Sequence, residues 1–186
     1  MMEMSLEKLK IKMNQMTINE LHIQFDLQPE SKINILKNIA RKCSKGYLFV
    51  DSSDGHCYLF DEDGNEDDVK KLTKIDGEMF YGSNIKSIII PDSVKSIGNW
   101  AFWNCESLKS IVIPDSVENI GSIGFTYCKS LKSVEIPDSV KKIGYRAFDN
   151  CESLKSLTFK GKTIDQVKAM NYYPFGIENE SIIRCC

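Results

Sequence analysis

The sequence of 186 residues has no long hydrophobic run. No segment approaches the ~18 consecutive apolar residues that a membrane-spanning helix needs. The opening residues, MMEMSLEKLKIKMNQM, mix charged with apolar side chains and contain no continuous apolar segment of the kind that secretion signals carry. We therefore expect a cytoplasmic protein that does not enter or bind a membrane.

Catalytic motifs are missing as well. The sequence contains no phosphate-binding loop, no GxSxG and no HExxH motif, and no pair of carboxylates stands out. The two histidines are His22 and His56, and Cys43 lies 14 residues before Cys57, a spacing that does not indicate a shared metal or an activated nucleophile. We therefore expect a non-catalytic protein that uses no metal and no other cofactor.

The seven cysteines do not indicate a disulfide framework. Their number is odd and no secretion signal is evident, whereas small disulfide-stabilised domains are secreted and pair their cysteines. Cys105, Cys128 and Cys151 recur at one position of a repeat. Such regular placement is typical of small buried apolar side chains, so we expect free thiols in the core.

The charge balance is slightly acidic and uneven. The net charge of −2 argues against direct nucleic-acid binding, since nucleic-acid-binding proteins are usually basic. The acidic residues concentrate in one run, DEDGNEDD, from Asp61 to Asp68. A calcium loop requires glycine at its sixth position and a bidentate glutamate at its twelfth, where this run has Glu66 and Leu72. The main interpretation is a solvated acidic turn.

The dominant feature of the chain is a repeat of 23 residues. The segment IPDSVKSIGNWAFWNCESLKS is followed by IVIPDSVENIGSIGFTYCKSLKS and then by VEIPDSVKKIGYRAFDNCESLKS. Aligned on Ile85, Leu108, Leu131 and Leu154, the apolar positions form the rows Ile88, Ile111, Val134, Leu157; Ile90, Ile113, Ile136, Phe159; Val94, Val117, Val140; Ile97, Ile120, Ile143; and Phe102, Phe125, Phe148. A fixed period that begins with L-x-x-L-x-L indicates a leucine-rich-repeat solenoid, in which each coil stacks on its neighbours.

Each coil has its own local signals. The segment LKSIVI is predicted to pair as a short strand with the same segment of adjacent coils. Pro114 ends this strand because proline has no N–H, and the Asp115–Ser116 pair favours the following turn by bonding nearby backbone. Gly98, Gly121 and Gly144 recur at a second bend, which predicts a positive φ or a close approach of backbones.

A degraded coil precedes the first full repeat. Ile75 and Phe80 are five residues apart, as Ile97 and Phe102 are. The array is therefore predicted to begin near Val69 and to hold about four coils, more than the roughly three that a stable solenoid needs.

The unit L-K-S-I-x-I-P-D-S-V-x-x-I-G-x-x-A-F-x-x-C resembles the BspA-like (bacterial surface antigen type) leucine-rich repeat. The resemblance is strong over residues 85–159 and weaker over residues 69–84. It implies a protein-binding solenoid without enzymatic activity. It also implies an alternative role as a surface adhesin, because many members of this family are secreted or bound to the cell surface.

The flanking segments complete a predicted architecture that is α+β overall. The solenoid covers residues 69–159, and residues 160–186 form a C-terminal cap. Its short helix, TIDQVKAM, starts at a capping box of Thr163 and Gln166. Ile164, Val167 and Met170 are predicted to lie near one face of this helix.

Residues 1–68 lack the repeat and are predicted to form a separate small α+β domain. PESKINILKNIARKCSKG is predicted to be a helix that ends at Gly46. YLFVDSSDGHCYLF is predicted to be a hairpin, because two apolar runs surround Asp54 and Gly55.

Positions that vary between coils are candidates for partner binding, because packing does not fix them. Tryptophan, tyrosine and arginine, which are enriched at binding hot spots, stand at several of them. Ile89 and Val112 on adjacent strands predict an exposed apolar strip, which is typical of an interface. The candidates in the repeats are Trp100, Trp103, Tyr127, Tyr145, Arg146, Ile89, Val112 and Glu135. In the alternative interpretation, the aromatic residues cover the convex side or pack against the N-terminal domain.

The main functional hypothesis is a non-catalytic protein that binds a protein partner through these variable positions. A second hypothesis is a phage-encoded inhibitor that docks on a host defence protein, as anti-CRISPR proteins do. In that case the acidic side chains would compete for a nucleic-acid-binding groove on the partner. The residues that would contribute are Asp61, Asp63, Glu66 and Asp67. A surface adhesin is the third hypothesis.

Overall fold

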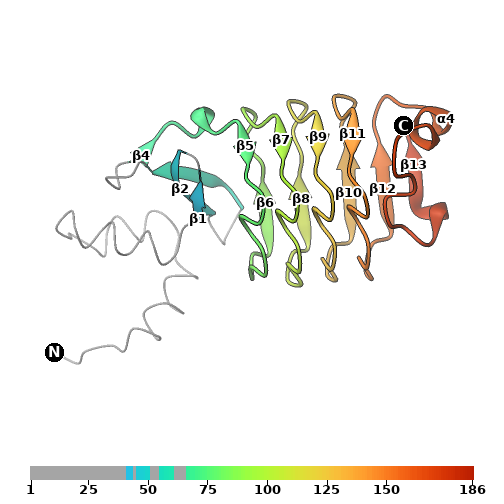
Figure 1. The fold of residues 1–186 in the computed structure, drawn as a ribbon, viewed down its shortest axis with the longest axis horizontal. Helices are drawn as coiled ribbons and strands as arrows, with labels where there is room; N and C mark the ends of the chain where they lie inside the picture. The colour runs from blue at the N-terminus through green and yellow to red at the C-terminus, as the bar shows by residue number, and fades with distance from the viewer. Residues whose placement is uncertain (1–40, 44, 51–54, 61–65) are drawn as a thin grey trace.

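The computed structural model describes residues 41–43, 45–50, 55–60 and 66–186. In this part of the chain, coils of strands and turns stack side by side along one axis, with β1 and β2 near one end and α4 at the other (Figure 1). Each coil contains a first strand, a turn, a second strand and a return segment without regular secondary structure. The leucine-rich-repeat solenoid with coils of about 23 residues is confirmed.

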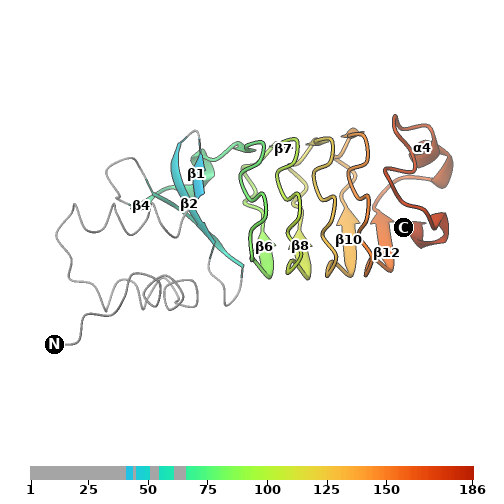
Figure 2. The same ribbon diagram turned by 60° about the horizontal axis from the view of Figure 1, so that its bottom comes forward.

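The first strands of the coils run in the same direction (Figure 2), and equivalent residues lie opposite each other in the parallel pairs β6–β8 and β10–β12. They are β6 (Ser87–Ile89), β8 (Ser110–Val112), β10 (Ser133–Ile136) and β12 (Ser156–Phe159). Ile88 pairs with Ile111 across β6 and β8, and Val134 pairs with Leu157 across β10 and β12. Proline follows β6, β8 and β10 as predicted, and β8 stops two residues before Pro114.

The second strands contain two residues each and also pair in parallel. They are β5 (Lys74–Ile75), β7 (Ser96–Ile97), β9 (Asn119–Ile120) and β11 (Lys142–Ile143). Ile75 pairs with Ile97, which confirms the degraded first coil.

The return segments comprise residues 77–82, 99–104, 122–127 and 145–150. These segments form no strand. In residues 99–104, however, alternate backbone N–H groups donate to carbonyls of the next coil. These bonds run from Trp100 to Ser122 at 3.1 Å, from Phe102 to Gly124 at 2.8 Å and from Asn104 to Thr126 at 2.9 Å. Backbone pairing from coil to coil therefore continues through the turns, as buried polar groups require.

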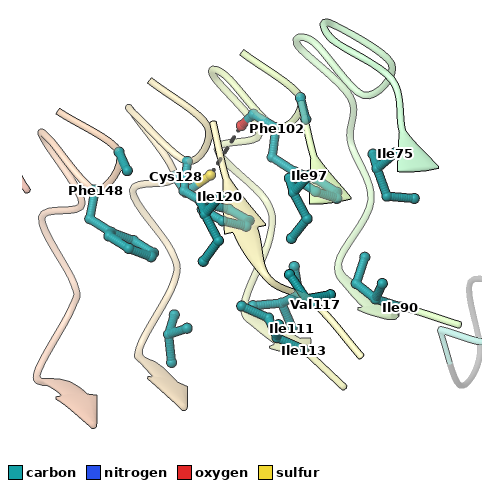
Figure 3. Packing of buried hydrophobic residues seen from close by; sticks show 14 of the residues in the cluster. Ile75, Ile90, Ile97, Phe102, Ile111, Ile113, Val117, Ile120, Cys128 and Phe148 are labelled. Atoms are coloured by element: carbon teal, nitrogen blue, oxygen red, sulfur yellow. Dashed lines mark hydrogen bonds between the residues drawn. The ribbon is translucent and has the colours of Figure 1, made fainter. Parts of the chain in front are cut away.

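The predicted rows of apolar residues fill one continuous core (Figure 3). Phe80, Phe102, Phe125 and Phe148 stack with ring centroids 5.0, 5.1 and 5.2 Å apart. Ile85, in the first full coil, is only partly buried. The rest of the row alignment is confirmed, because the equivalent residues of neighbouring coils are buried together.

Glycine at the second bend is explained by a close approach of backbones. A Cβ added at Gly121 would lie 2.5 Å from the Asn99 nitrogen, and one at Gly144 would lie 2.3 Å from the Ser122 nitrogen. Real Cβ atoms essentially never come so close to backbone, so only glycine fits without a shift of the coils.

The serine after the proline does not bond locally as predicted. The Ser116 hydroxyl donates to the Val94 carbonyl of the preceding coil at 2.7 Å. The turn itself is closed by the Val117 N–H, which donates to the Pro114 carbonyl at 3.1 Å. This serine therefore links adjacent coils, because stacking brings an unpaired carbonyl within its reach.

At the N-terminal end, the predicted hairpin is confirmed and the predicted helix boundary is wrong. Strands β2 (Gly46–Val50) and β3 (Cys57–Phe60) pair antiparallel. Strand β1 (Arg41–Cys43) pairs with β2, so a helix cannot extend to Gly46, and its upstream part lies outside the described residues. Tertiary strand pairing here overrides the helical pattern of the sequence. Strand β4 (Glu66–Asp67) and a 3₁₀ helix, η1 (Val69–Lys71), lead into the first coil.

The hairpin covers the N-terminal edge of the solenoid. Leu48 and Leu59 are buried in the same core as the coils. The Ile89 N–H on β6 donates to the Gly55 carbonyl at 2.8 Å, and the Cys57 thiol donates to the Ile89 carbonyl at 3.3 Å. These bonds protect an edge that would otherwise expose unpaired backbone groups. A domain boundary at residue 68 stays a prediction.

At the C-terminal end, the predicted capping box is confirmed. The Gln166 N–H donates to Thr163 Oγ1 at 3.3 Å, and the Thr163 N–H donates to Gln166 Oε1 at 2.8 Å, at the start of α4 (Ile164–Lys168). The predicted apolar face is only partly correct. Val167 is buried and Met170 partly buried, but Ile164 is exposed.

The last residues add a strand as well as covering the end. Strand β13 (Ile183–Cys185), which follows the 3₁₀ helix η2 (Glu180–Ile182), pairs in parallel with β12. The buried Phe175 supplies the carbonyl that accepts from the Phe148 N–H at 3.0 Å. The C-terminal segment therefore extends the solenoid through β13, and a cap with bounds at residues 160–186 stays a prediction.

Candidate functional site

The candidate residues of the repeats lie on two surfaces that the core separates. Ile89, Val112 and Glu135 stand on the first strands β6, β8 and β10, which we call the strand side. The other candidates stand on the return segments, namely Trp100, Trp103, Tyr127, Tyr145 and Arg146. Because buried residues of both regions meet between them, these two groups of residues do not form one site.

On the strand side, the predicted apolar strip is shorter than expected. Ile89 and Val112 are side by side in register, and Val112 is 54% exposed. Ile89 is only half-exposed, and its backbone is bonded to the N-terminal hairpin. The Glu135 carboxylate is 2.6 Å from the Lys160 ammonium. Of Ile89 and Val112, Val112 is therefore the more exposed.

The return segments carry a group of aromatic rings that crosses three coils. Trp103 is half-buried and stacks on Tyr81, with ring centroids 4.5 Å apart and planes at 18°. Its other neighbour is Tyr127, whose ring lies edge-on at 5.9 Å. Sequence reasoning missed Tyr81, although Tyr81 precedes Trp103 by 22 residues, the same offset that separates Phe80 from Phe102.

A second aromatic contact lies toward the C-terminal end. Tyr145 is 50% exposed and meets Tyr172 edge-on, with ring centroids 5.9 Å apart. The Arg146 guanidinium carbon lies 5.3 Å from the centre of the Tyr145 ring and also approaches the Asp149 carboxylate at 3.9 Å. Sequence reasoning missed Tyr172 because it lies in the cap, outside the regular period.

Several of the candidate residues on the return segments have a left-handed backbone conformation. The φ angle is 53° at Trp100, 61° at Tyr127 and 51° at Arg146. At the position that Trp100 and Arg146 share, Ile123 has a φ of 59° and Glu78 a φ of 60°. Residues other than glycine, asparagine and aspartate rarely adopt this left-handed backbone conformation, which destabilises the fold by about 1–3 kcal/mol per residue. The outer corners of the return segments therefore hold large side chains in an unfavourable backbone conformation.

The acidic run is described only in part. Asp61 and Asp63 lie outside the described residues, and Glu66 begins β4. Asp67 accepts hydrogen bonds from the Lys71 ammonium at 2.6 Å and from the Asp68 N–H at 2.8 Å, and these contacts lower the pKa of its carboxyl group. The carboxylate of Asp67 is therefore already bonded within its own chain.

The repeated cysteines are structural. The Cys105, Cys128 and Cys151 thiols donate to the carbonyls of Phe80, Phe102 and Phe125 at 2.9, 3.2 and 3.1 Å (Figure 3 shows the Cys128 bond). Burial raises the pKa of Cys105 and of Cys151 to about 12, and it raises that of Cys128 as well. Since the thiolate is the reactive form, these cysteines are inert near neutral pH.

The described residues contain no cluster of histidine, cysteine or carboxylate side chains that could hold a metal ion. None of the helices described is long and apolar enough to span a membrane.

The stacked coils, the parallel strand pairs and the stacked phenylalanines define a leucine-rich-repeat protein. The BspA type leucine rich repeat region matches residues 70–182 in six copies, so the chain belongs to this family. The match extends past the predicted repeats into the predicted cap and ends at residue 182.

Solved structures with a similar chain are bacterial leucine-rich-repeat proteins. One from Bacteroides capillosus is 26% identical, with 66% of this chain and 99% of that chain covered and a TM-score of 0.47. One from T. pallidum is 24% identical, with 60% and 67% covered and a TM-score of 0.40. A leucine rich cell surface protein from Faecalibacterium prausnitzii is 21% identical, with 66% and 45% covered and a TM-score of 0.39. The comparison with curated proteins found no match.

Proposed function

We propose that this protein is a non-catalytic binding protein that holds a protein partner on its return segments. The proposed contact surface, called the aromatic surface below, consists of Tyr81, Trp100, Trp103, Tyr127 and Tyr145. Membership of a leucine-rich-repeat family supports a binding role in general, and the choice of this surface is our inference from its side chains.

The observation that carries the proposal is the exposure of large aromatic side chains on these segments. Tyr81 is 51% and Trp100 42% exposed, so much of each side chain contacts water. Exposed aromatic residues that lie close together are uncommon away from interfaces, and tryptophan and tyrosine are over-represented at binding hot spots.

The structure gives less support to the acidic run as the contact surface. Asp67 is paired with Lys71, and the inhibitor hypothesis would need the acidic side chains to be available to a partner. We therefore place the proposed contact on the solenoid. That this protein is a phage-encoded inhibitor or a surface adhesin stays a hypothesis about its role.

The test is a pull-down from a lysate of the source cell, with a matched pair of variants. The first variant is Trp100→Ala/Tyr127→Ala/Tyr145→Ala, which removes exposed rings and keeps the Tyr81–Trp103 stack. The control is Val112→Ala/Thr158→Ala, which trims the strand side. We expect a protein that the wild type and the control retain and that the aromatic variant loses. Equal retention by all three baits would show that the aromatic surface is not the contact.

A further inference from the structure

The first strands of the coils do not form one continuous sheet. Among the described strands, β8 pairs with β6, and β12 pairs with both β10 and β13, but β8 and β10 belong to different sheets. Figure 2 shows a wider space between the ribbons of β8 and β10 than between those of β6 and β8 or of β10 and β12. Strand pairing along the strand side is therefore interrupted at one place, which we call the β8–β10 junction.

The backbone hydrogen bonds at the entrance to the first strands show the same interruption. A lysine precedes each of these strands, and its N–H donates to the carbonyl of the equivalent lysine one coil earlier. The N···O distance is 2.8 Å from Lys109 to Lys86 and 2.9 Å from Lys155 to Lys132. Across the junction, from Lys132 to Lys109, it is 3.4 Å. Backbone bonds of normal strength have this distance at about 2.9 Å, so the bond across the junction is weak.

The core is also slightly more open to solvent at this place. Ile111 and Ile113, which point inward from the coil of β8, are each 8% exposed. Their equivalents one coil earlier, Ile88 and Ile90, are each 1% exposed, and those one coil later are at most 1% exposed. Because β6 pairs with β8 on the other flank, we assign the additional exposure to the junction.

The other parts of the same two coils are well bonded to each other. In the turn, the Ser139 hydroxyl donates to the Val117 carbonyl at 2.7 Å. The second strands β9 and β11 pair in parallel. On the return segments, the Phe125 N–H donates to the Ala147 carbonyl at 2.8 Å, and the Phe125 ring stacks on that of Phe148. The two coils are therefore joined along three of their four parts, and the first strands are the exception.

We infer that the β8–β10 junction is a hinge, at which the strand side opens and closes while the return segments act as the axis. Each coil of a solenoid contacts only its neighbours, so the array changes shape most easily at its weakest interface between coils. Opening there disrupts no strand pair and stretches a bond that is already weak. Separation of the return segments would instead break three backbone bonds of normal length, donated by Ile123, Phe125 and Tyr127. Opening would change the angle between the two coils and with it the curvature of the solenoid. This inference does not depend on which surface holds a partner.

Amide hydrogen exchange of the full chain, followed residue by residue by NMR, tests the opening. Lys109, Lys132 and Lys155 stand in the same local sequence, SLKS, so their amides share one intrinsic exchange rate. We expect the Lys132 amide to exchange at least about tenfold faster than the other two, because local opening exposes it to solvent. On the return side of the same junction, the Phe125 amide should exchange no faster than that of Phe102, which makes the equivalent bond one coil earlier at 2.8 Å.

A second measurement distinguishes an opening motion from a fixed gap. Hinge motions occur within microseconds to milliseconds, and relaxation dispersion of isoleucine methyl groups detects exchange on this timescale. We expect dispersion at Ile111 and Ile113, whose surroundings change when the junction opens. Ile120 and Ile143 should show none, because their strands β9 and β11 stay paired across the same junction.

Three outcomes would overturn the inference. One is a Lys132 amide as well protected as those of Lys109 and Lys155, which would mean that the junction does not open. Another is a Phe125 amide that loses protection together with Lys132, because the two coils would then separate as a whole and not about an axis. The third is fast exchange at Lys132 without dispersion at Ile111, which would mean that the gap is fixed.

Discussion

The strand side and the return segments surround one core with the same period, yet they are built differently. On the strand side, the chain forms strands that pair in parallel, as Ile88 does with Ile111. On the return segments, the chain has left-handed residues such as Trp100 and forms no strand. Both nevertheless bond their backbone groups to the next coil. A solenoid therefore needs coil-to-coil pairing, and it does not need β conformation to obtain it.

The outer residues of the two regions differ more than the inner ones. Inside, the same side-chain types recur, with the Phe102 and Phe125 rings stacked from one coil to the next. Outside, the strand side carries a row of lysines, whereas the return segments carry Trp100 and Tyr127. The inner rows are fixed by packing, and the outer rows are free to differ between the two faces. The mutations below test this distinction, beginning with the inner face of the return segments.

Phe125→Ala should be the most destabilising of the three tests. The ring is fully buried between Phe102 and Phe148, so its removal leaves a cavity and breaks two stacking contacts. We expect a loss of about 3–5 kcal/mol in the free energy of unfolding, measured by urea denaturation. Ile136→Val on the inner face of the strand side is the calibrating variant, with an expected loss of about 0.5–1.5 kcal/mol. Equal losses would mean that the phenylalanine stack does not dominate the core.

Much of the fold could be predicted because it depends on period and local pattern. The rows, the degraded coil at Ile75, the hairpin and the capping box at Thr163 each follow from residues close together in sequence or exactly one coil apart. Two predictions were wrong at residues whose structure is determined by contact with a segment distant in sequence. Arg41–Cys43 forms a strand because β2 lies beside it, and Ser116 bonds the preceding coil because stacking brings a free carbonyl close.

The candidate surface could be predicted only in part, for a similar reason. Variation between coils identified Trp100 and Trp103, but it did not show that Trp103 stacks on Tyr81. Tyr81 belongs to the degraded coil, and Tyr127 is 24 residues after Trp103, so the three rings do not occupy one row of the alignment. Separation of the candidates onto two surfaces also required the path of the chain around the core.

Trp103→Ala tests whether an outer side chain of the return segments contributes to stability. Its ring is half-buried and contacts both Tyr81 and Tyr127, so we expect a loss of about 1–2 kcal/mol, well below that of Phe125→Ala. Val112→Ala on the strand side should change stability by less than about 0.5 kcal/mol, because Val112 is mostly exposed. Thermal and urea unfolding would measure both. If Trp103→Ala matched Phe125→Ala, Trp103 would be part of the core and not of a contact surface.

The smallest expected effect compares the backbone conformation of the return segments with that of the strand side. Glycine and alanine are each placed at one outer position of each region, and the stabilities of the two variants are compared. At Trp100, where φ is 53°, glycine should be more stable than alanine by about 0.5–1 kcal/mol, because alanine keeps the unfavourable left-handed conformation. At Val112, on a regular strand, the order should reverse by a similar amount, because glycine loses more conformational freedom on folding. Neither alanine nor glycine retains the original side chain, so the difference within each pair reports the backbone alone. Urea unfolding of Trp100→Gly, Trp100→Ala, Val112→Gly and Val112→Ala measures the two differences. The same order at both positions would mean that the left-handed corners are not strained.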